Sequence, residues 1–205
     1  MSDVLEKIKY LRENSKKRNF VQSFDLSINL KNLDVKRPEN RIKGEVVLPH
    51  PVPGRKICFF TDSIPVSDPE VTVIKKSEME KIGKREMKKI AKRHDVFLAE
   101  APLMPTVAKL FGQILGPRNK LPSPVPPGSD VGRILDRARR TVRFSVKKTP
   151  VVHCIVGKES MEDEKIKENI EAVISSVTSA LPRGREQIKN AYLKLTMSQA
   201  VEVKV

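Results

Sequence analysis

The chain has 205 residues, enough for one large domain or two modest ones with buried cores. Its 40 Lys and Arg outnumber 25 Asp and Glu, which leaves a net charge of +15. This balance favours a polyanionic partner, nucleic acid before membrane. The alternative is a thermostable protein with a charged, solvated surface, but ion-pair networks need both signs and here one sign dominates.

Several protein classes are disfavoured by features that the sequence lacks. No apolar run approaches the ~18 residues of a membrane helix. The first 17 residues carry acidic side chains within an amphipathic pattern, unlike a signal peptide. The two cysteines, Cys58 and Cys154, make no disulfide framework, which is typical of a reducing cytoplasm. We therefore expect a cytoplasmic protein without a membrane partner.

The first 63 residues predict one helix and three strands. Helical spacing of apolar residues indicates a helix over residues 3–17. Apolar residues at every second position predict a strand over residues 22–30, the clearest strand pattern in the chain. A polar, basic connection over residues 32–43 leads to strands at 44–48 and 56–61, which a proline-rich turn joins.

Beyond a proline-bearing boundary at residues 63–69, strands and helices alternate. Short apolar runs predict strands over residues 71–74, 96–99, 141–147 and 151–156. Helices are predicted from a capping box at Ser77 and Glu80 through Ile90, over residues 103–115, and from Ser129 or Asp130 to Arg140. This alternation is typical of a small parallel α/β sheet.

The last 50 residues predict one long helix, marked by Ile166 and Val177 at its ends, and a terminal hairpin. Alternation on both sides of Met197-Ser198-Gln199 makes these residues the predicted tip of the hairpin. Matching apolar faces sets Leu195 opposite Val201, Leu193 opposite Val203 and Ala191 opposite Val205. A methionine at a hairpin tip is unusual, because its flexible thioether usually fills cores.

The domain organisation follows from the size of the two terminal segments. Neither the first 63 nor the last 50 residues contain enough apolar side chains to form a core alone. We therefore predict one discontinuous α+β domain from residues 1–63 and 156–205, with residues 64–155 inserted as an α/β domain. The insert holds 19 basic and 9 acidic residues, net +10, against +5 for the remainder. Charge alone places a nucleic-acid surface on the insert.

The sequence contains no recognisable catalytic or metal-binding constellation. His153-Cys154 is the one His/Cys pairing, and no second ligand pair stands at metal spacing. Neither a phosphate-binding glycine loop nor a Gly-x-Ser-x-Gly elbow is present. We therefore expect no enzyme activity, no metal and no cofactor. The alternative, an α/β enzyme that acts on a nucleotide in the insert, is supported by fold analogy alone.

Basic residues recur at helical spacing within the insert. One predicted helix carries two stripes, and a second helix carries a third: Lys84, Lys88 and Lys92; Arg85, Lys89 and Arg93; Arg133, Arg137 and Arg140. Each stripe either contacts phosphates or is solvated. Because aromatic residues make up only 4% and Trp is absent, base stacking along a single strand is disfavoured. Recognition of a folded RNA by shape, phosphates and 2′-hydroxyls fits better.

Five motifs in chain order carry a resemblance to a known family. They are Val47-Leu-Pro-His50, Ile114-Leu-Gly-Pro-Arg-Asn-Lys-Leu-Pro-Ser-Pro124, Val152-His-Cys-Ile-Val-Gly-Lys158, Lys167-Glu-Asn-Ile170 and Thr196-Met197. Together they resemble the ribosomal protein L-one family of the large subunit, in its archaeal form. The resemblance implies a discontinuous α+β domain with an inserted Rossmann-like α/β domain. It also implies binding of ribosomal RNA at the lateral stalk near the tRNA exit site.

The resemblance implies further partners and a set of RNA-binding residues. Members of the family assist release of deacylated tRNA and repress translation of their own messenger RNA, and we expect a monomer when the protein is free. The expected site lies in the discontinuous domain and comprises Phe24, Arg41, Lys43, Lys158, Lys167, Lys189, Thr196, Met197 and Ser198. The insert would add electrostatic attraction. Two positions depart from the family pattern, Ser198 and Asn119, each in place of a usual glycine.

Overall fold

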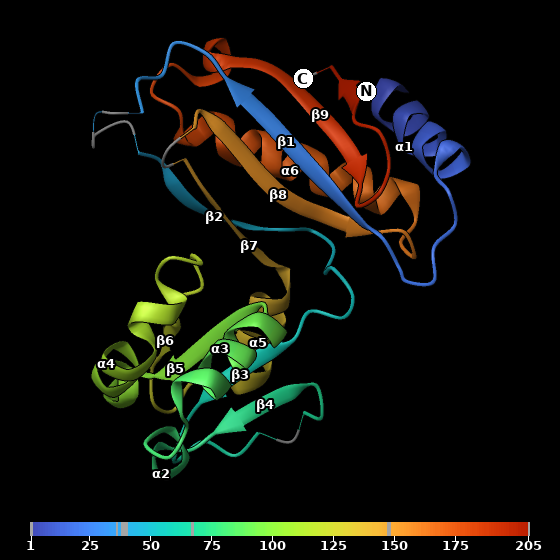
Figure 1. Ribbon diagram of the computed structural model, residues 1–205. Coiled ribbons are helices and arrows are strands. Elements are labelled where there is room, and N and C mark those ends of the chain that lie inside the picture. The colour runs from blue at the N-terminus through green and yellow to red at the C-terminus, as the bar shows by residue number, and fades with distance from the viewer. Residues whose placement is uncertain (1, 36, 38–40, 67, 147–148, 205) are drawn as a thin grey trace. The chain divides into compact units, whose positions relative to one another are not determined.

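The computed structural model describes residues 2–35, 37, 41–66, 68–146 and 149–204, which combine helices and sheets as predicted. Within these residues no helix is long and apolar enough to cross a membrane. The chain divides into two compact units, drawn with their elements in Figure 1. The outer unit comprises Met1–Pro53 and Arg140–Val205, and the inserted unit comprises Gly54–Arg139.

The outer unit is built on a four-stranded antiparallel sheet with the strand order β10-β9-β1-β8. The strands are β1 (Ser23–Leu30), β8 (Val151–Lys158), β9 (Ile188–Leu195) and β10 (Val201–Val203). In β1 every second residue is buried, so one face of the sheet is apolar and the other is polar. This alternation is the pattern from which the strand was predicted.

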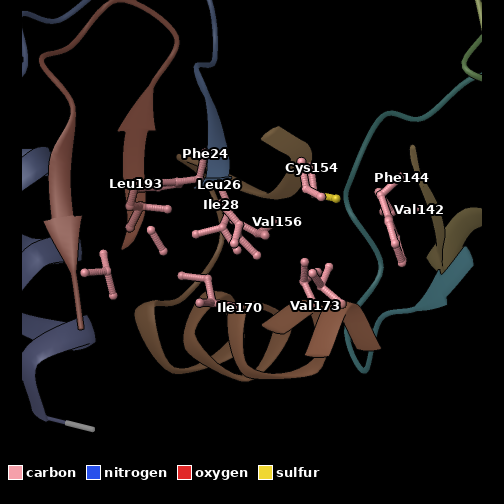
Figure 2. Packing of buried hydrophobic residues seen from close by; sticks show 14 of the residues in the cluster. Phe24, Leu26, Ile28, Val142, Phe144, Cys154, Val156, Ile170, Val173 and Leu193 are labelled. Atoms are coloured by element: carbon pink, nitrogen blue, oxygen red, sulfur yellow. The ribbon is translucent and has the colours of Figure 1, made fainter. Parts of the chain in front are cut away.

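Two helices cover the apolar face. Helix α6 (Asp163–Ala180) packs against β8, and α1 (Ser2–Asn14) packs against α6, β9 and β10. Figure 2 shows Ile28 of β1 on the side of the sheet that faces Ile170 and Val173 of α6. The polar face of the sheet has no covering helix among the described residues, so its side chains are accessible to a partner.

A second, two-stranded sheet in the outer unit joins β2 (Lys43–Val47) to β7 (Thr141–Ser145) in antiparallel register. Val46 of β2 and Phe144 of β7 contribute to the same apolar core as β1. Gly44 lies against the Phe144 ring, and a Cβ at that position would be 2.4 Å from Phe144 Cζ. A side chain at this position would therefore displace the Phe144 ring.

The inserted unit is built on a parallel sheet with the order β4-β3-β5-β6. The strands are β3 (Ile57–Phe60), β4 (Val71–Ile74), β5 (Val96–Glu100) and β6 (Ser123–Val125), and the helices are α2 (Lys76–Met79), α3 (Lys84–Arg93), α4 (Met104–Leu115) and α5 (Val131–Arg140). All four residues of β3 are buried, since separate apolar clusters pack on the two faces of the sheet. One cluster includes α3 and α4, and the other includes α5.

The boundaries of the compact units differ from those expected at residues 63/64 and 155/156. Strand β3 belongs to the inserted unit because it pairs in parallel with β4 and β5. Strands β7 and β8 belong to the outer unit because they pair with β2 and β1. With the boundaries at 53/54 and 139/140, the inserted unit holds 17 basic and 10 acidic residues, net +7, and the outer unit 23 and 15, net +8. The charge excess expected on the insert disappears.

Several predicted elements also differ in detail. The helix expected from residue 77 to 90 is two helices, which separate at Gly83, the residue that precedes α3. Ser77 does not begin α2; instead the Lys75 N–H donates to Glu78 Oε2 (3.4 Å). Helix α1 ends at Asn14 rather than residue 17. Strand β6, within the proline-bearing loop, was not predicted and pairs with β5.

The register predicted for the terminal hairpin is wrong by two residues. Val201 lies opposite Leu193 and Val203 opposite Ala191, while Leu195 pairs with Phe24 of β1 on its other side. The turn therefore extends from residue 196 to 200. An apolar pattern with period two determines which face a residue occupies, but a shift of two preserves every face. The partner predicted for Ala191, Val205, lies outside the described residues.

Candidate nucleic-acid interface

The ends of three strands of the outer unit lie side by side at one edge of the sheet, the edge that strand ends form and not the one along an outermost strand. Ser23 at the start of β1 pairs with Lys158 at the end of β8, and Phe24 pairs with Leu195 at the end of β9. The surface at this edge, which we call the strand-end surface, is formed by Phe20, Val21, Lys158, Thr196, Met197 and Ser198. The sheet therefore unites segments from both ends of the chain, including the predicted Thr196-Met197 pair.

The Thr196-Met197 pair is held in place by the residues that precede β1. The Ser23 N–H donates to Thr196 Oγ1 (3.1 Å), and the Met197 N–H donates to Gln22 Oε1 (3.1 Å). Gln22 has no exposed surface, and its main chain is held in turn by Glu159, whose N–H donates to Gln22 O (2.9 Å). The Met197 side chain, by contrast, is 59% exposed. The backbone of the turn is thus fixed while the thioether projects into solvent.

Ser198 closes the turn with its side chain. The Leu195 N–H donates to Ser198 Oγ (2.8 Å), and the Ser198 N–H donates to Leu195 O (3.1 Å). In the described part of the chain only Asn32 and Asn119 are non-glycine residues with positive φ, so Ser198 has an ordinary backbone conformation. The hydroxyl is therefore used within the turn, and no left-handed geometry that would favour glycine is needed.

Phe24, which is among the expected RNA-binding residues, does not project from the strand-end surface. Its ring has no exposed surface and lies in the core, with the Arg12 guanidinium carbon 5.5 Å from the ring centre. Arg12 also donates to Asp163 Oδ1 (2.8 Å) and so ties α1 to the start of α6. Phe24 consequently supports the strand-end surface from below, because it pairs with Leu195 directly before Thr196.

The exposed aromatic residue at this edge is Phe20, which is not among the predicted RNA-binding residues. Phe20 is 52% exposed and Val21 is 56% exposed, and both precede Gln22. They follow the basic run Lys16-Lys17-Arg18, whose side chains are all exposed. An aromatic residue two positions after clustered cations, before the alternating pattern of β1 begins, is the signal in the sequence that could have identified Phe20. The strand-end surface therefore combines apolar side chains with positive charge.

The remaining predicted residues are not all brought to this edge. Lys158 is half-buried and belongs to it through its pairing with Ser23. Arg41 and Lys43 are exposed, but Lys43 pairs with Ser145 in the separate two-stranded sheet. Lys189 stands at the opposite end of β9 from Thr196.

Lys167 is also predicted to bind RNA, and it lies on helix α6 rather than on a strand end. Its ammonium nitrogen is 3.8 Å from Glu171 Oε1, so part of its charge is compensated within the protein. Of the charged residues in the predicted set, Lys158 is therefore the one that strand pairing places at the strand-end surface.

The polar face of the outer sheet adjoins the strand-end surface. Ser27 Oγ and His153 Nδ1 are 2.8 Å apart, and Asn190 Nδ2 donates to the Tyr192 hydroxyl (3.0 Å). Asp25 lies one row nearer the edge, and partial burial raises the pKa of its carboxyl, against the opposing charges of Lys194 and His153. This face offers hydrogen-bond donors and acceptors of the kind that contact riboses and base edges in folded RNA.

Neither a metal site nor a reactive thiol is found among the residues that the structure describes. His153 and Cys154 point to opposite faces of β8, so they do not form a ligand pair. Cys58 and Cys154 are both buried, and burial raises the pKa of each thiol to about 12. These cysteines are therefore core residues without nucleophilic character at neutral pH.

The carboxyl ends of β3 and β5, where parallel sheets commonly bind nucleotides, are occupied by a buried carboxylate. Glu100 accepts hydrogen bonds from Thr61 Oγ1 (3.1 Å), the Asp62 N–H (3.1 Å) and the Ser63 hydroxyl. The Ser63 hydroxyl is the main cause of the lowered pKa of Glu100. A buried negative charge at this place repels phosphate, which disfavours the alternative of a nucleotide-dependent enzyme.

The sequence as a whole matches known proteins over nearly its full length. Residues 11–199 match the family model described as the ribosomal protein L1p/L10e family. The chain is 45% identical to the large ribosomal subunit protein uL1 of Pyrococcus abyssi, over 98% of this chain and 95% of the relative. It is 44% identical to the proteins of the same name from Pyrococcus horikoshii and Methanocaldococcus jannaschii, over 98% of this chain and 94% of each relative.

Proposed function

Because this chain belongs to the ribosomal protein L1p/L10e family, we propose that it binds ribosomal RNA in the large ribosomal subunit through its strand-end surface. Its relatives are named as ribosomal proteins and not as enzymes, and a ribosomal protein works on the ribosome in the cytoplasm. The observation that carries the proposal is the fixed turn that presents Met197. This turn is anchored by Ser23 and Gln22 beside the exposed Phe20.

The proposed mechanism is docking of a preformed protein surface onto a folded RNA. Met197 and Phe20 would pack against sugars and bases, since both side chains are more than half exposed on a rigid backbone. Lys158 and the Lys16-Lys17-Arg18 run would contact phosphates. The polar face of the sheet would add hydrogen bonds to riboses. Phosphate contacts give affinity, and the shaped apolar edge gives specificity.

The finer role proposed for this chain follows the expectations from its sequence. The RNA target would be the lateral stalk near the tRNA exit site, where the protein would assist release of deacylated tRNA. A similar fold in its own messenger RNA would occupy the same surface, so that excess protein represses translation. The outer unit would act as the discontinuous α+β domain and the inserted unit as the Rossmann-like domain of a monomer.

Alanine substitutions in the turn test the site. Thr196→Ala removes the hydroxyl that accepts from Ser23, and Met197→Ala removes the projecting thioether. We expect each to weaken binding of an isolated stalk RNA fragment by about 1–3 kcal/mol, the range of a specific contact. Filter binding with a labelled fragment measures the change.

Val47→Ala is the matched control, because Val47 is an exposed apolar residue on β2 of the same unit. Its RNA affinity should equal that of the parent chain. Unchanged affinity in both turn variants would remove the strand-end surface as the binding site. Competition between the ribosomal fragment and the leader of the protein's own messenger RNA would test whether both occupy one surface.

A further inference from the structure

The outward side of α3, in the inserted unit, is a continuous positive surface. Met87 and Ala91 are buried and Ile90 is half-buried, which defines the inner side of the helix. Six exposed cations occupy the other side: Lys84, Arg85, Lys88, Lys89, Lys92 and Arg93. At about 100° per residue they span the half of the helix opposite the buried side chains. We call these six residues the α3 cationic face.

The charges of the α3 cationic face are not compensated within the protein. Among the described residues, ion pairs engage other cations of the same unit, such as Arg139 with Asp68 (2.6 Å) and Arg133 with Asp130 (3.3 Å), but none of these six. Glu86 is the one acidic residue on the helix. Six unpaired positive charges lie within a helix only ~15 Å long, so they produce a strong local potential that attracts polyanions.

The spacing of the cations suits a nucleic-acid backbone. Lys84, Lys88 and Lys92 form one row at four-residue intervals, and Arg85, Lys89 and Arg93 form a second row beside it. Each interval advances ~6 Å along the helix axis. This rise is comparable to the separation of successive phosphates along an RNA strand. A backbone that lies along the helix could therefore meet a cation at each phosphate.

A hollow extends the positive surface beyond the helix. It has a volume of about 510 Å³ and lies between α3 and the strands β3 and β4. Three cations line it, Lys56, Lys89 and Arg93, together with the Thr72 hydroxyl and the single carboxylate of Glu86. Such a lining suits a phosphate group that is accepted by several donors at once.

The helix that carries this surface is held rigidly at its C-terminal end. The Lys120 ammonium donates to the carbonyl oxygens of His94 (2.6 Å) and Ala91 (3.3 Å). His94 Nε2 and Thr72 Oγ1 are 2.9 Å apart, which ties the same end of α3 to β4. Because the helix is fixed at the hollow, its backbone needs little ordering when a ligand binds.

We propose that the α3 cationic face and its hollow form a second RNA-binding surface, which holds the phosphate backbone without reading sequence. A membrane fits less well, because an interfacial helix inserts exposed apolar side chains and those of α3 face the core. This surface lies on a different unit from the strand-end surface and extends the function proposed above. It raises the rate of encounter with RNA, whereas the strand-end surface selects the target.

The test uses the full chain with Thr196→Ala and Met197→Ala already introduced, which weakens the specific contacts of the strand-end surface and leaves its phosphate contacts the same in every variant. The probe is an RNA duplex of arbitrary sequence, and fluorescence anisotropy measures its affinity over a series of KCl concentrations. The test variant carries Lys84→Gln, Lys88→Gln and Lys92→Gln. The control carries Lys75→Gln, Lys76→Gln and Lys81→Gln, three exposed lysines of the same unit with the same charge change.

We expect the α3 variant to lower the slope of log affinity against log salt by about three units, one for each lysine, and to lose about tenfold or more in affinity at low salt. The control variant should retain both values. A second variant, Lys89→Gln with Arg93→Gln, should lower the slope by about two units if phosphates enter the hollow. Circular dichroism verifies that all variants remain folded.

Three results would overturn the proposal. An unchanged slope in the α3 variant would mean that the helix makes no phosphate contact. Equal losses in the α3 and control variants would mean that binding reflects net charge alone. Binding to phosphatidylserine vesicles that exceeds binding to RNA and depends on the same lysines would assign the surface to a membrane instead.

Discussion

At the scale of single residues, the most specific of the family motifs, Ile114 to Pro124, has a structural role: it fixes the end of helix α3. Asn119 has φ +59°, a left-handed conformation that asparagine tolerates better than most residues. Asn119 therefore adopts the backbone conformation that the usual glycine would favour. Lys120, directly after it, reaches the carbonyl oxygens at the end of α3, and burial lowers the pKa of its ammonium group.

Gln22 is a second residue whose role only the structure reveals. Its Oε1 accepts the Met197 N–H, while its Nε2 is buried without a partner among the described residues. Gln22→Leu removes the acceptor but also the unpaired donor, so we expect a change in unfolding free energy below about 1 kcal/mol. The turn would lose its anchor, and stalk RNA affinity should fall about tenfold. Thermal melts and filter binding separate the two effects.

Gln187→Leu serves as the comparison for this variant. Gln187 is also a buried glutamine of the outer unit, and its side chain accepts from the Arg183 N–H (3.0 Å). It lies next to the start of β9, away from the strand-end surface. If Gln187→Leu weakens RNA binding as much as Gln22→Leu does, the anchoring role of Gln22 is wrong.

At the scale of elements, the loop after β3 depends on one carboxylate at the end of β5. Glu100 accepts from three successive residues, Thr61, Asp62 and Ser63. Its lowered pKa means that the folded state favours the charged form. The contribution to stability is therefore fully present above the ordinary pKa of 4.5 and is lost as the pH falls through the lower folded value.

Glu100→Gln tests this loop anchor. We expect the variant to lose about 2 kcal/mol of unfolding free energy at pH 7, because hydrogen bonds to a charged acceptor are replaced by weaker ones. The difference from the parent chain should shrink as the pH falls below 4.5. Urea unfolding at a series of pH values measures it. Glu80→Gln, at an exposed position, should be neutral, and a pH-independent deficit in Glu100→Gln would contradict the account.

Elements were predicted well where the signal was local and poorly where it was not. The strand β1 and the helix α6 follow directly from apolar periodicity. The break between α2 and α3 at Gly83 was missed, since a helical pattern continues across one glycine. Strand β6 was missed because prolines mask a strand whose partner, β5, supplies the pairing.

At the scale of the whole molecule, the outer unit requires both ends of the chain. Strand β9 lies between β1 and β10, and its residues Ala191, Leu193 and Leu195 have no exposed surface. A chain that ends at Gln187 would lose these side chains, and each buried large residue contributes about 2–5 kcal/mol. This loss equals or exceeds the total stability of a typical domain.

We expect the chain truncated after Gln187 to lose the cooperative unfolding transition of the outer unit and to bind no stalk RNA. Thermal melts followed by circular dichroism, with filter binding, provide the measurement. Truncation after Ala200 removes only the edge strand β10 and should retain a transition at lower temperature. An unaltered midpoint in the shorter chain would show that β9 is not part of the core.

The sequence by itself determined the types of most elements, the buried face of each, the family, and the position of the Thr196-Met197 pair at a turn. These features depend on local periodicity and on short motifs, which can be recognised without knowing which strands pair with each other. Only the tertiary structure decided the unit boundaries, the hairpin register and the exposure of Phe20. The reason is that strand pairing joins residues far apart in the chain, and an apolar pattern specifies a face without specifying the partner.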